Sequence, residues 1–83
     1  MAMQIKSLND LRSGEGGRIA QINGGRGMVN RLAALDIRPG TRITKLNSGL
    51  MQGPVTIEVN RTQIAIGFGM AARILVEIED SAR

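Results

Sequence analysis

Short runs with apolar residues at every second position, separated by turn-forming residues, constrain this chain more than any other feature. Residues 55–59 and 74–78 show the pattern of strands with one buried face. Residues 18–22, 41–46 and 62–66 are further strand candidates. So many short strands would leave unpaired edges, which closure of the sheet removes. We therefore predict a mainly β domain, a small SH3-like barrel of about five strands with one short helix and two helical turns, with an OB-type barrel as the alternative.

The apolar period changes to that of a helix after a glycine-rich loop. Met28, Leu32 and Leu35 recur at the spacing of one helical face, and we expect that face to pack on the core. Proline disfavours helical geometry in the residue before it, and glycine readily adopts a positive φ. The helix should therefore end before Pro39-Gly40, with Gly40 in the left-handed region of a turn.

Two features are expected within the strands. Ile19 and Ile22 lie three positions apart, which a β-bulge in the first strand would reconcile with strand structure. Asn60 and Arg61 separate two strand candidates, and Asn tolerates positive φ better than most residues. We predict a hairpin turn at this position.

The remaining elements are short. A helical turn at residues 7–11 should plug one end of the domain with Leu8 and Leu11, and a second turn is expected at 67–73. The length of 83 residues suits one domain, 1–83, and we expect its polar end, 79–83, to be frayed.

The chain contains neither Cys nor His, the side chains most often used for proton transfer, nucleophilic attack and binding of transition metals. We therefore expect a non-enzymatic protein with no catalytic residue, no cofactor and no metal site. Glu77, Glu79 and Asp80 are the only acidic cluster, and a solvated face is the favoured interpretation over weak metal binding. No segment approaches the roughly 18 apolar residues of a membrane span, so we expect a soluble, cytoplasmic protein.

A dinucleotide-binding motif is only superficially present. The segment Gly67-Phe68-Gly69-Met70-Ala71-Ala72 fits G-x-G-x-x-A, but eleven residues follow it, too few for the crossover helix and the next strand. We interpret the glycines as permitting a tight reversal between the strand and the helical turn.

The net charge of +4 arises from eleven basic and seven acidic residues, and nine of the basic residues are Arg. The arginines are dispersed along the chain, and Phe68 is its only aromatic residue. Nucleic-acid-binding domains usually show a basic stripe and, for single strands, aromatic stacking platforms. A nucleic-acid-binding small barrel therefore remains only an alternative.

The outer face of the predicted helix is the best candidate for contact with a protein partner. Its small residues would allow a partner to approach closely, and its arginines could supply bidentate hydrogen bonds at the rim. The loop before residue 55 adds two apolar residues. The candidate partner-binding residues are Asn30, Arg31, Ala34, Arg38, Leu50 and Met51. Self-association, if it occurs, should use strand edges or the Leu50-Met51 loop.

Several motifs occur together in a fixed order along almost the whole chain. They are Leu8-x-x-Leu11-x-x-Gly14, Arg31-Leu32-x-x-Leu35-x-Ile37-x-Pro39-Gly40, Gly53-Pro54, and Ala65-Ile66-Gly67-x-Gly69-Met70-Ala71 before Ile74-Leu75-Val76. In this order and spacing the sequence resembles the FeoA family, the small cytosolic components of ferrous iron uptake. Asp36 and Phe68 depart from the family pattern, which commonly has Gly and a basic residue at these positions.

The resemblance implies an SH3-like barrel without catalytic activity that supports the membrane permease FeoB, whose cytosolic region carries a GTPase domain. It also leaves open an interaction domain of a metal-responsive transcription regulator, since similar domains occur at the C-terminus of such repressors. A chaperone that carries iron itself is disfavoured, because the chain lacks soft and borderline ligands.

Overall fold

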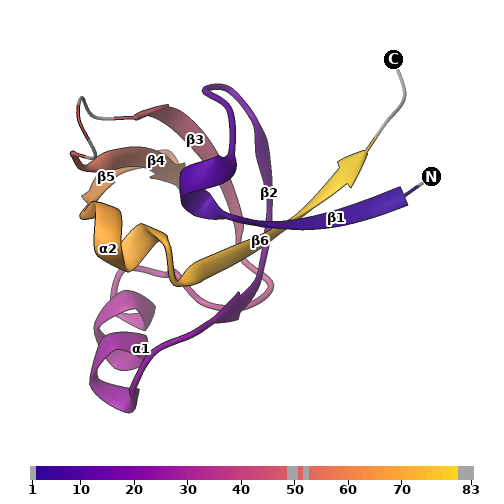
Figure 1. The fold of residues 1–83 in the computed structure, drawn as a ribbon. Coiled ribbons are helices and arrows are strands. Elements are labelled where there is room, and N and C mark those ends of the chain that lie inside the picture. Colours follow the sequence, from indigo (N-terminus) through magenta and orange to yellow (C-terminus); the bar gives the residue numbers. More distant parts are fainter. Residues whose placement is uncertain (1, 49–50, 52, 81–83) are drawn as a thin grey trace.

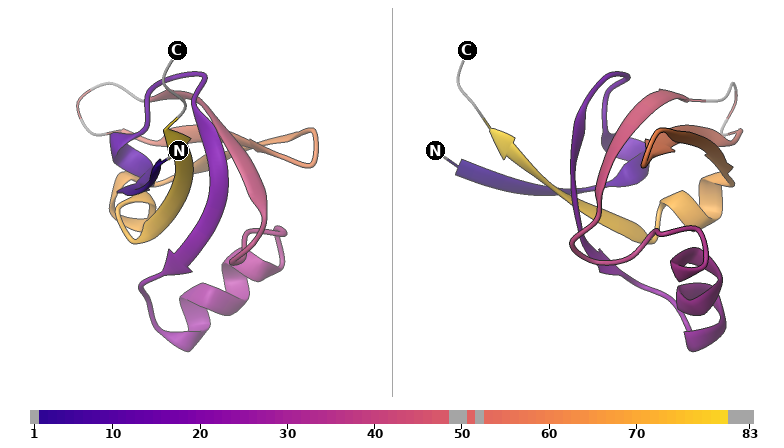
Figure 2. Two further views of the ribbon diagram at one scale, coloured as in Figure 1. Left: turned by 90° about the vertical axis from the view of Figure 1, so that its right-hand side faces the viewer. Right: turned by 180° about the vertical axis from the view of Figure 1, so that it is seen from behind.

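In this computed structural model, residues 2–48, 51 and 53–80 are described, and they form one antiparallel sheet of six strands in the order β1-β6-β2-β3-β4-β5 (Figure 1). The strands are β1 (Ala2–Ser7), β2 (Gly16–Ile22), β3 (Arg42–Ser48), β4 (Val55–Val59), β5 (Thr62–Ile66) and β6 (Ile74–Asp80). The helical elements are η1 (Leu8–Asp10), α1 (Arg26–Ala33) and α2 (Phe68–Ala71). The predicted mainly β, SH3-like class is confirmed. Figure 2 shows the sheet curling around its core, with α1 at one end of the barrel.

The first strand, β1, was not predicted from the sequence. Its apolar residues Met3 and Ile5 are both exposed, so β1 lacks the buried face on which strand prediction depends. It forms because β6 supplies a hydrogen-bonding partner, with Ile5 opposite Glu77. The strand β6 extends to Asp80 along β1, so it includes the first two residues of the segment 79–83 that was expected to be frayed.

The core is aliphatic and gathers side chains from both ends of the chain. Its buried apolar residues are Leu8, Leu11, Ile19, Leu32, Ile37, Ile43, Val55, Ile57, Val59, Ile66, Ala71, Ile74, Val76 and Ile78. The alternation predicted for residues 55–59 and 74–78 is confirmed by the buried faces of β4 and β6. Leu8 and Leu11 are also buried, as expected of a plug at residues 7–11.

The predicted inward face of α1 is only partly correct. Leu32 is buried and Met28 packs partly against the core, but Leu35 is 46% exposed. The helix ends at Ala33, two residues before Leu35, so the helical spacing no longer applies there. Ile37, whose N–H donates to the Leu32 carbonyl at 2.9 Å, is fully buried just beyond the helix.

Two adjacent glycines let β2 lie close to both of its neighbouring strands. A side chain at Gly17 would overlap the Glu77 carbonyl oxygen, and its Cβ would lie 2.9 Å from Cγ2 of Ile78. A Cβ at Gly16 would lie 2.7 Å from the Ile43 carbonyl oxygen on the other side. The glycines therefore permit the tight curvature of the barrel. Further along β2, the predicted bulge is confirmed by a register shift between Ile19 and Gln21.

The predicted turns at Gly40 and Asn60-Arg61 are confirmed by φ values of 94°, 52° and 66°. The interpretation that Gly67 and Gly69 permit a tight reversal after β5 finds no support in their backbone geometry. Neither has a positive φ, and a Cβ at either position would meet nothing within 4 Å. The chain reverses after β5 with ordinary backbone angles.

Candidate partner-binding surface

The outer face of α1 combines polar, small and apolar side chains. Asn30, Arg31 and Ala34 are all exposed, while Leu32 holds the opposite face of the helix on the core. Leu35 follows Ala34 directly in the sequence, just beyond the end of α1, and its exposed side chain adds an apolar residue to the predicted set. The error in placing Leu35 in the core therefore enlarges the candidate surface. Pro39 disfavours helical geometry only at Arg38, so the sequence carried no clear signal that the helix ends before Leu35.

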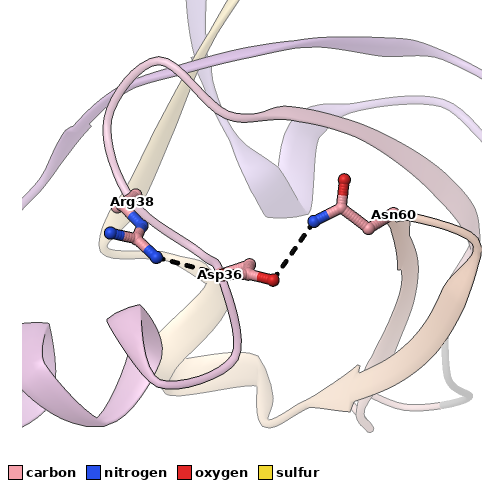
Figure 3. Close-up of polar contacts among 3 residues, drawn as sticks. All are labelled: Asp36, Arg38 and Asn60. Atoms are coloured by element: carbon pink, nitrogen blue, oxygen red, sulfur yellow. Dashed lines mark hydrogen bonds and ion pairs between the residues drawn. The ribbon is translucent and has the colours of Figure 1, made fainter.

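The corner after α1 is held by the carboxylate of Asp36 (Figure 3). Arg38 Nη2 lies 3.0 Å from Asp36 Oδ1, and Asn60 Nδ2 donates to Asp36 Oδ2 at 3.2 Å. Asp36 has a φ of 65°, the left-handed conformation in which Gly is common and Asp is tolerated. At this position Asp therefore supplies a side-chain bridge that Gly could not make.

The ion pair between Asp36 and Arg38 orients the Arg38 guanidinium but contributes little to the free energy of unfolding. Its two side chains are 58% and 56% exposed, and ion pairs in water contribute roughly 0–1 kcal/mol. One amino group of Arg38 is engaged with Asp36, and a guanidinium carries five N–H donors in all. The predicted partner-binding residue Arg38 thus has donors left for an acidic or carbonyl partner.

The second predicted segment lies apart from α1. Met51 is 98% exposed, whereas Leu50 lies outside the described residues. Figures 1 and 2 place the end of β3 at the opposite end of the barrel from α1. The structure therefore brings Asn30, Arg31, Ala34 and Arg38 to one region and does not bring Met51 to it. We call the exposed residues 30, 31, 34, 35 and 38 the α1 surface.

Sequence reasoning missed one buried charged residue, Lys45 of β3, which is 1% exposed. Its Nζ donates to the backbone carbonyls of Leu11 at 2.7 Å and Asn9 at 3.1 Å. Burial lowers the pKa of Lys45, and the nearby charges of Asp10 and Glu15 oppose that shift. The sequence contained a signal for this burial, because alternate residues of a strand point to the same face, and residue 45 therefore shares the face of the buried Ile43.

Lys45 has a structural function in this arrangement. Its two hydrogen bonds attach β3 to η1 and to the residue after it, across 36 and 34 positions of the sequence. On the other side of η1, Asn9 Nδ2 donates to the Phe68 carbonyl at 3.0 Å. The plug that carries Leu8 and Leu11 is therefore tied to both β3 and α2.

The described residues offer no cluster of three or more metal-ligating side chains. Glu77 is half-buried. The side chains of Glu79 and Asp80 lie outside the described part of the structure, which therefore does not test the solvated acidic face expected at these three positions. Within the described ranges, no helix has the length and apolar character needed to cross a membrane.

The sequence pattern of the FeoA domain matches residues 6–78 of this chain. A protein of Methanocaldococcus jannaschii named "Putative Fe(2+) transport protein A" is 33% identical over 66 residues, which cover 80% of this chain and 78% of the relative.

Solved structures show the same relationship. The crystal structure of an iron uptake regulatory protein (FeoA) is 30% identical, with a TM-score of 0.80 over 90% of this chain and 99% of the other. A manganese-dependent transcriptional repressor has a TM-score of 0.83 at 20% identity. That match covers 95% of this chain but 44% of the repressor, and at this identity it shows a shared fold alone.

Proposed function

This chain belongs to the FeoA family, and we propose that it is a non-enzymatic, cytoplasmic accessory protein of ferrous iron uptake that binds and modulates the cytosolic region of the permease FeoB. Family membership and the name of the archaeal relative support the link to iron transport. The absence of Cys and His from the sequence supports a function in binding instead of catalysis.

The observation that carries this proposal is the exposed α1 surface. Protein interfaces combine an apolar centre with a polar rim in which Arg is enriched. Leu35 supplies the apolar centre, because nearly half of its surface is exposed although it is a large aliphatic residue. Arg31 and Arg38 supply the rim, and the small side chain of Ala34 allows close approach of a partner backbone.

The electrostatic character of the α1 surface indicates a partner with acidic or carbonyl groups. Arg31 lies in the last turn of α1, which has no acidic residue in its first turn. Arg38 is held by Asp36 in one orientation, so less side-chain entropy is lost when its remaining donors bind a partner. A carboxylate of the partner could accept two parallel hydrogen bonds from such a guanidinium.

The test measures binding of this protein to the purified cytosolic region of FeoB by titration calorimetry. Arg31→Glu and Ala34→Arg change exposed residues, so each should alter the free energy of unfolding by under about 0.5 kcal/mol. Each should weaken binding by roughly 2 kcal/mol or more, about thirtyfold in affinity. Uptake of labelled ferrous iron in cells that lack the native protein should fall in parallel.

Matched controls separate the α1 surface from general charge effects. Arg12→Glu makes the same charge change as Arg31→Glu, and Ala20→Arg makes the same change as Ala34→Arg, at exposed residues outside the α1 surface. Both controls should bind and restore uptake like the wild type. If Arg31→Glu and Ala34→Arg fold and bind normally, the α1 surface is not the contact. If the wild type itself does not bind FeoB, the proposed partnership is wrong.

A further inference from the structure

Among the described strands, β1 lies at one edge of the sheet and carries exposed apolar residues. It pairs with β6, and no other strand of the described sheet pairs with it. Met3 and Ile5 are 57% and 60% exposed, although both are large apolar residues on a regular strand. Figure 1 shows that β1 and the end of β6 project from the body of the barrel, away from α1. Natural proteins usually protect such edges, because an open edge pairs readily with another strand.

We propose that β1 is the surface through which two copies of this protein associate, antiparallel across a twofold axis with Gln4 opposite Gln4 of the second copy. Residues directly opposite each other in antiparallel strands point to the same face of the sheet. In this register Met3 lies opposite Ile5 of the second copy, and the reverse pair is formed as well. Four exposed apolar side chains then cover one another on one face of a continuous sheet.

The charges of β1 and β6 distinguish this register from its neighbours. Lys6 falls opposite Ala2 of the second copy, and the residue that pairs with Ala2 on β6 is Asp80. Lys6 and Asp80 of the other copy then occupy one row of the sheet, with Ala2 between them and their strands roughly 10 Å apart. No acidic residue joins that row if the register shifts so that Ile5 faces Ile5. In that case Lys6 faces Gln4, whose partner on β6 is Ile78.

A further shift in the same direction would place Lys6 opposite Lys6, where like charges repel. Registers offset by a single residue are excluded for a different reason. They would turn the apolar residues of the two copies toward opposite faces of the sheet. The twofold pairing centred on Gln4 thus brings the apolar residues together on one face and avoids a pair of like charges.

The size of the contact predicts a weak dimer. A strand of six residues presents far less than the roughly 800 Å² per partner of a standard stable interface. We expect a dissociation constant on the order of 0.1 mM. Since β1 projects away from α1, the dimer would leave both α1 surfaces free. Association through β1 is therefore independent of binding to FeoB.

The register is tested by disulfide cross-linking, which suits this chain because it has no Cys. Two Gln4→Cys copies would have Cα atoms about 4.5–5.5 Å apart in the proposed sheet, within the range that a disulfide spans. Two Lys6→Cys copies would be offset by about 13 Å along the strands and could not bridge. Under mild oxidation, Gln4→Cys should therefore cross-link at least tenfold faster than Ile5→Cys, Lys6→Cys or Met51→Cys.

Sedimentation of the reduced proteins tests the contact itself. The wild type should change from monomer at about 10 μM to mostly dimer at about 1 mM. Ile5→Lys should weaken association at least tenfold, because it places a cation among the apolar residues, while its neighbour Glu77 on β6 favours that lysine within the monomer. Met51→Lys makes the same change at an exposed residue elsewhere and should associate like the wild type.

Three results would overturn the proposal. The first is a wild type that stays monomeric at about 1 mM. The second is fastest cross-linking at a position other than Gln4→Cys, which contradicts the register. The third is equal association by the wild type and a folded Ile5→Lys protein, or equal weakening by Ile5→Lys and Met51→Lys. If Gln4→Cys fails to fold, the sedimentation comparison alone decides.

Discussion

Asp36 and Asn60 are joined side chain to side chain, with Asn60 Nδ2 donating to Asp36 Oδ2 at 3.2 Å across 24 positions of the sequence. Both residues have left-handed backbone conformations, with φ values of 65° and 52°. The hydrogen bond connects the corner after α1 to the β4–β5 hairpin, and the same carboxylate pairs with Arg38 (Figure 3). The orientation of the α1 surface is therefore coupled to a hairpin that is distant in sequence.

Backbone conformation should decide the effect of substitutions at Asp36. Asp36→Gly removes two exposed side-chain contacts but relieves the positive φ, so the free energy of unfolding should change by less than about 1 kcal/mol. Asp36→Val loses the same contacts and places a β-branched residue at positive φ, which should cost about 1–3 kcal/mol more. Urea unfolding measures both. Equal stabilities of the two variants would show that the conformation at Asp36 carries no cost.

The buried Lys45 should make stability rise with pH in alkaline solution. Burial lowers its pKa in the folded protein below the ordinary value of 10.5. Between these two values the unfolded chain holds a proton that the folded protein has already lost, so the free energy of unfolding increases with pH. The sequence has no Cys, His or Tyr, so these side chains do not contribute to the change in stability in alkaline solution.

Urea unfolding at a series of pH values from about 8 to 10.5 measures this rise. Lys45→Met should abolish it, whereas Lys6→Met should retain it. Lys45→Met should also cost about 1–3 kcal/mol, because the Asn9 and Leu11 carbonyls lose their donor. A pH profile that is the same in the wild type and Lys45→Met would contradict the assignment.

The two glycine-containing segments should respond oppositely to alanine. Gly17→Ala places a Cβ against the Glu77 carbonyl oxygen and Ile78, and we expect a loss of about 2 kcal/mol or more in unfolding free energy. Gly69→Ala meets open space within α2 and should stabilise the protein by up to about 1 kcal/mol. Thermal unfolding of the pair is the measurement. A stable Gly17→Ala protein would show that β2 can move away from β6 at little cost.

Leu35 and Leu32 should separate binding from stability. Leu35→Ser alters an exposed side chain, so it should cost under about 1 kcal/mol of stability while weakening the complex with the cytosolic region of FeoB severalfold or more. Leu32→Ala removes a buried side chain and should cost about 2–5 kcal/mol. Urea unfolding and calorimetric titration give the two readouts. If Leu35→Ser destabilises the fold as strongly as Leu32→Ala, Leu35 belongs to the core after all.

Strand prediction succeeded where one face of a strand is buried and failed where neither is. The apolar alternation of β4 and β6 reports burial against the core, which is a property of each strand alone. In β1 the apolar residues Met3 and Ile5 are exposed, so their spacing carries no information about a core. The prediction for α1 failed at Leu35 for a related reason, since helical spacing identifies a buried face only while the helix continues.

The sequence by itself determined the mainly β class, the turns at Gly40 and Asn60-Arg61, the plug at Leu8 and Leu11 and the resemblance to the FeoA family. These depend on local backbone preferences and on residue order, which are readable along the chain. Only the tertiary structure decided the pairing of β1 with β6, the burial of Lys45 under η1 and the bridge from Asp36 to Asn60. Each joins residues far apart in sequence, and their proximity depends on how the whole sheet curls around its core.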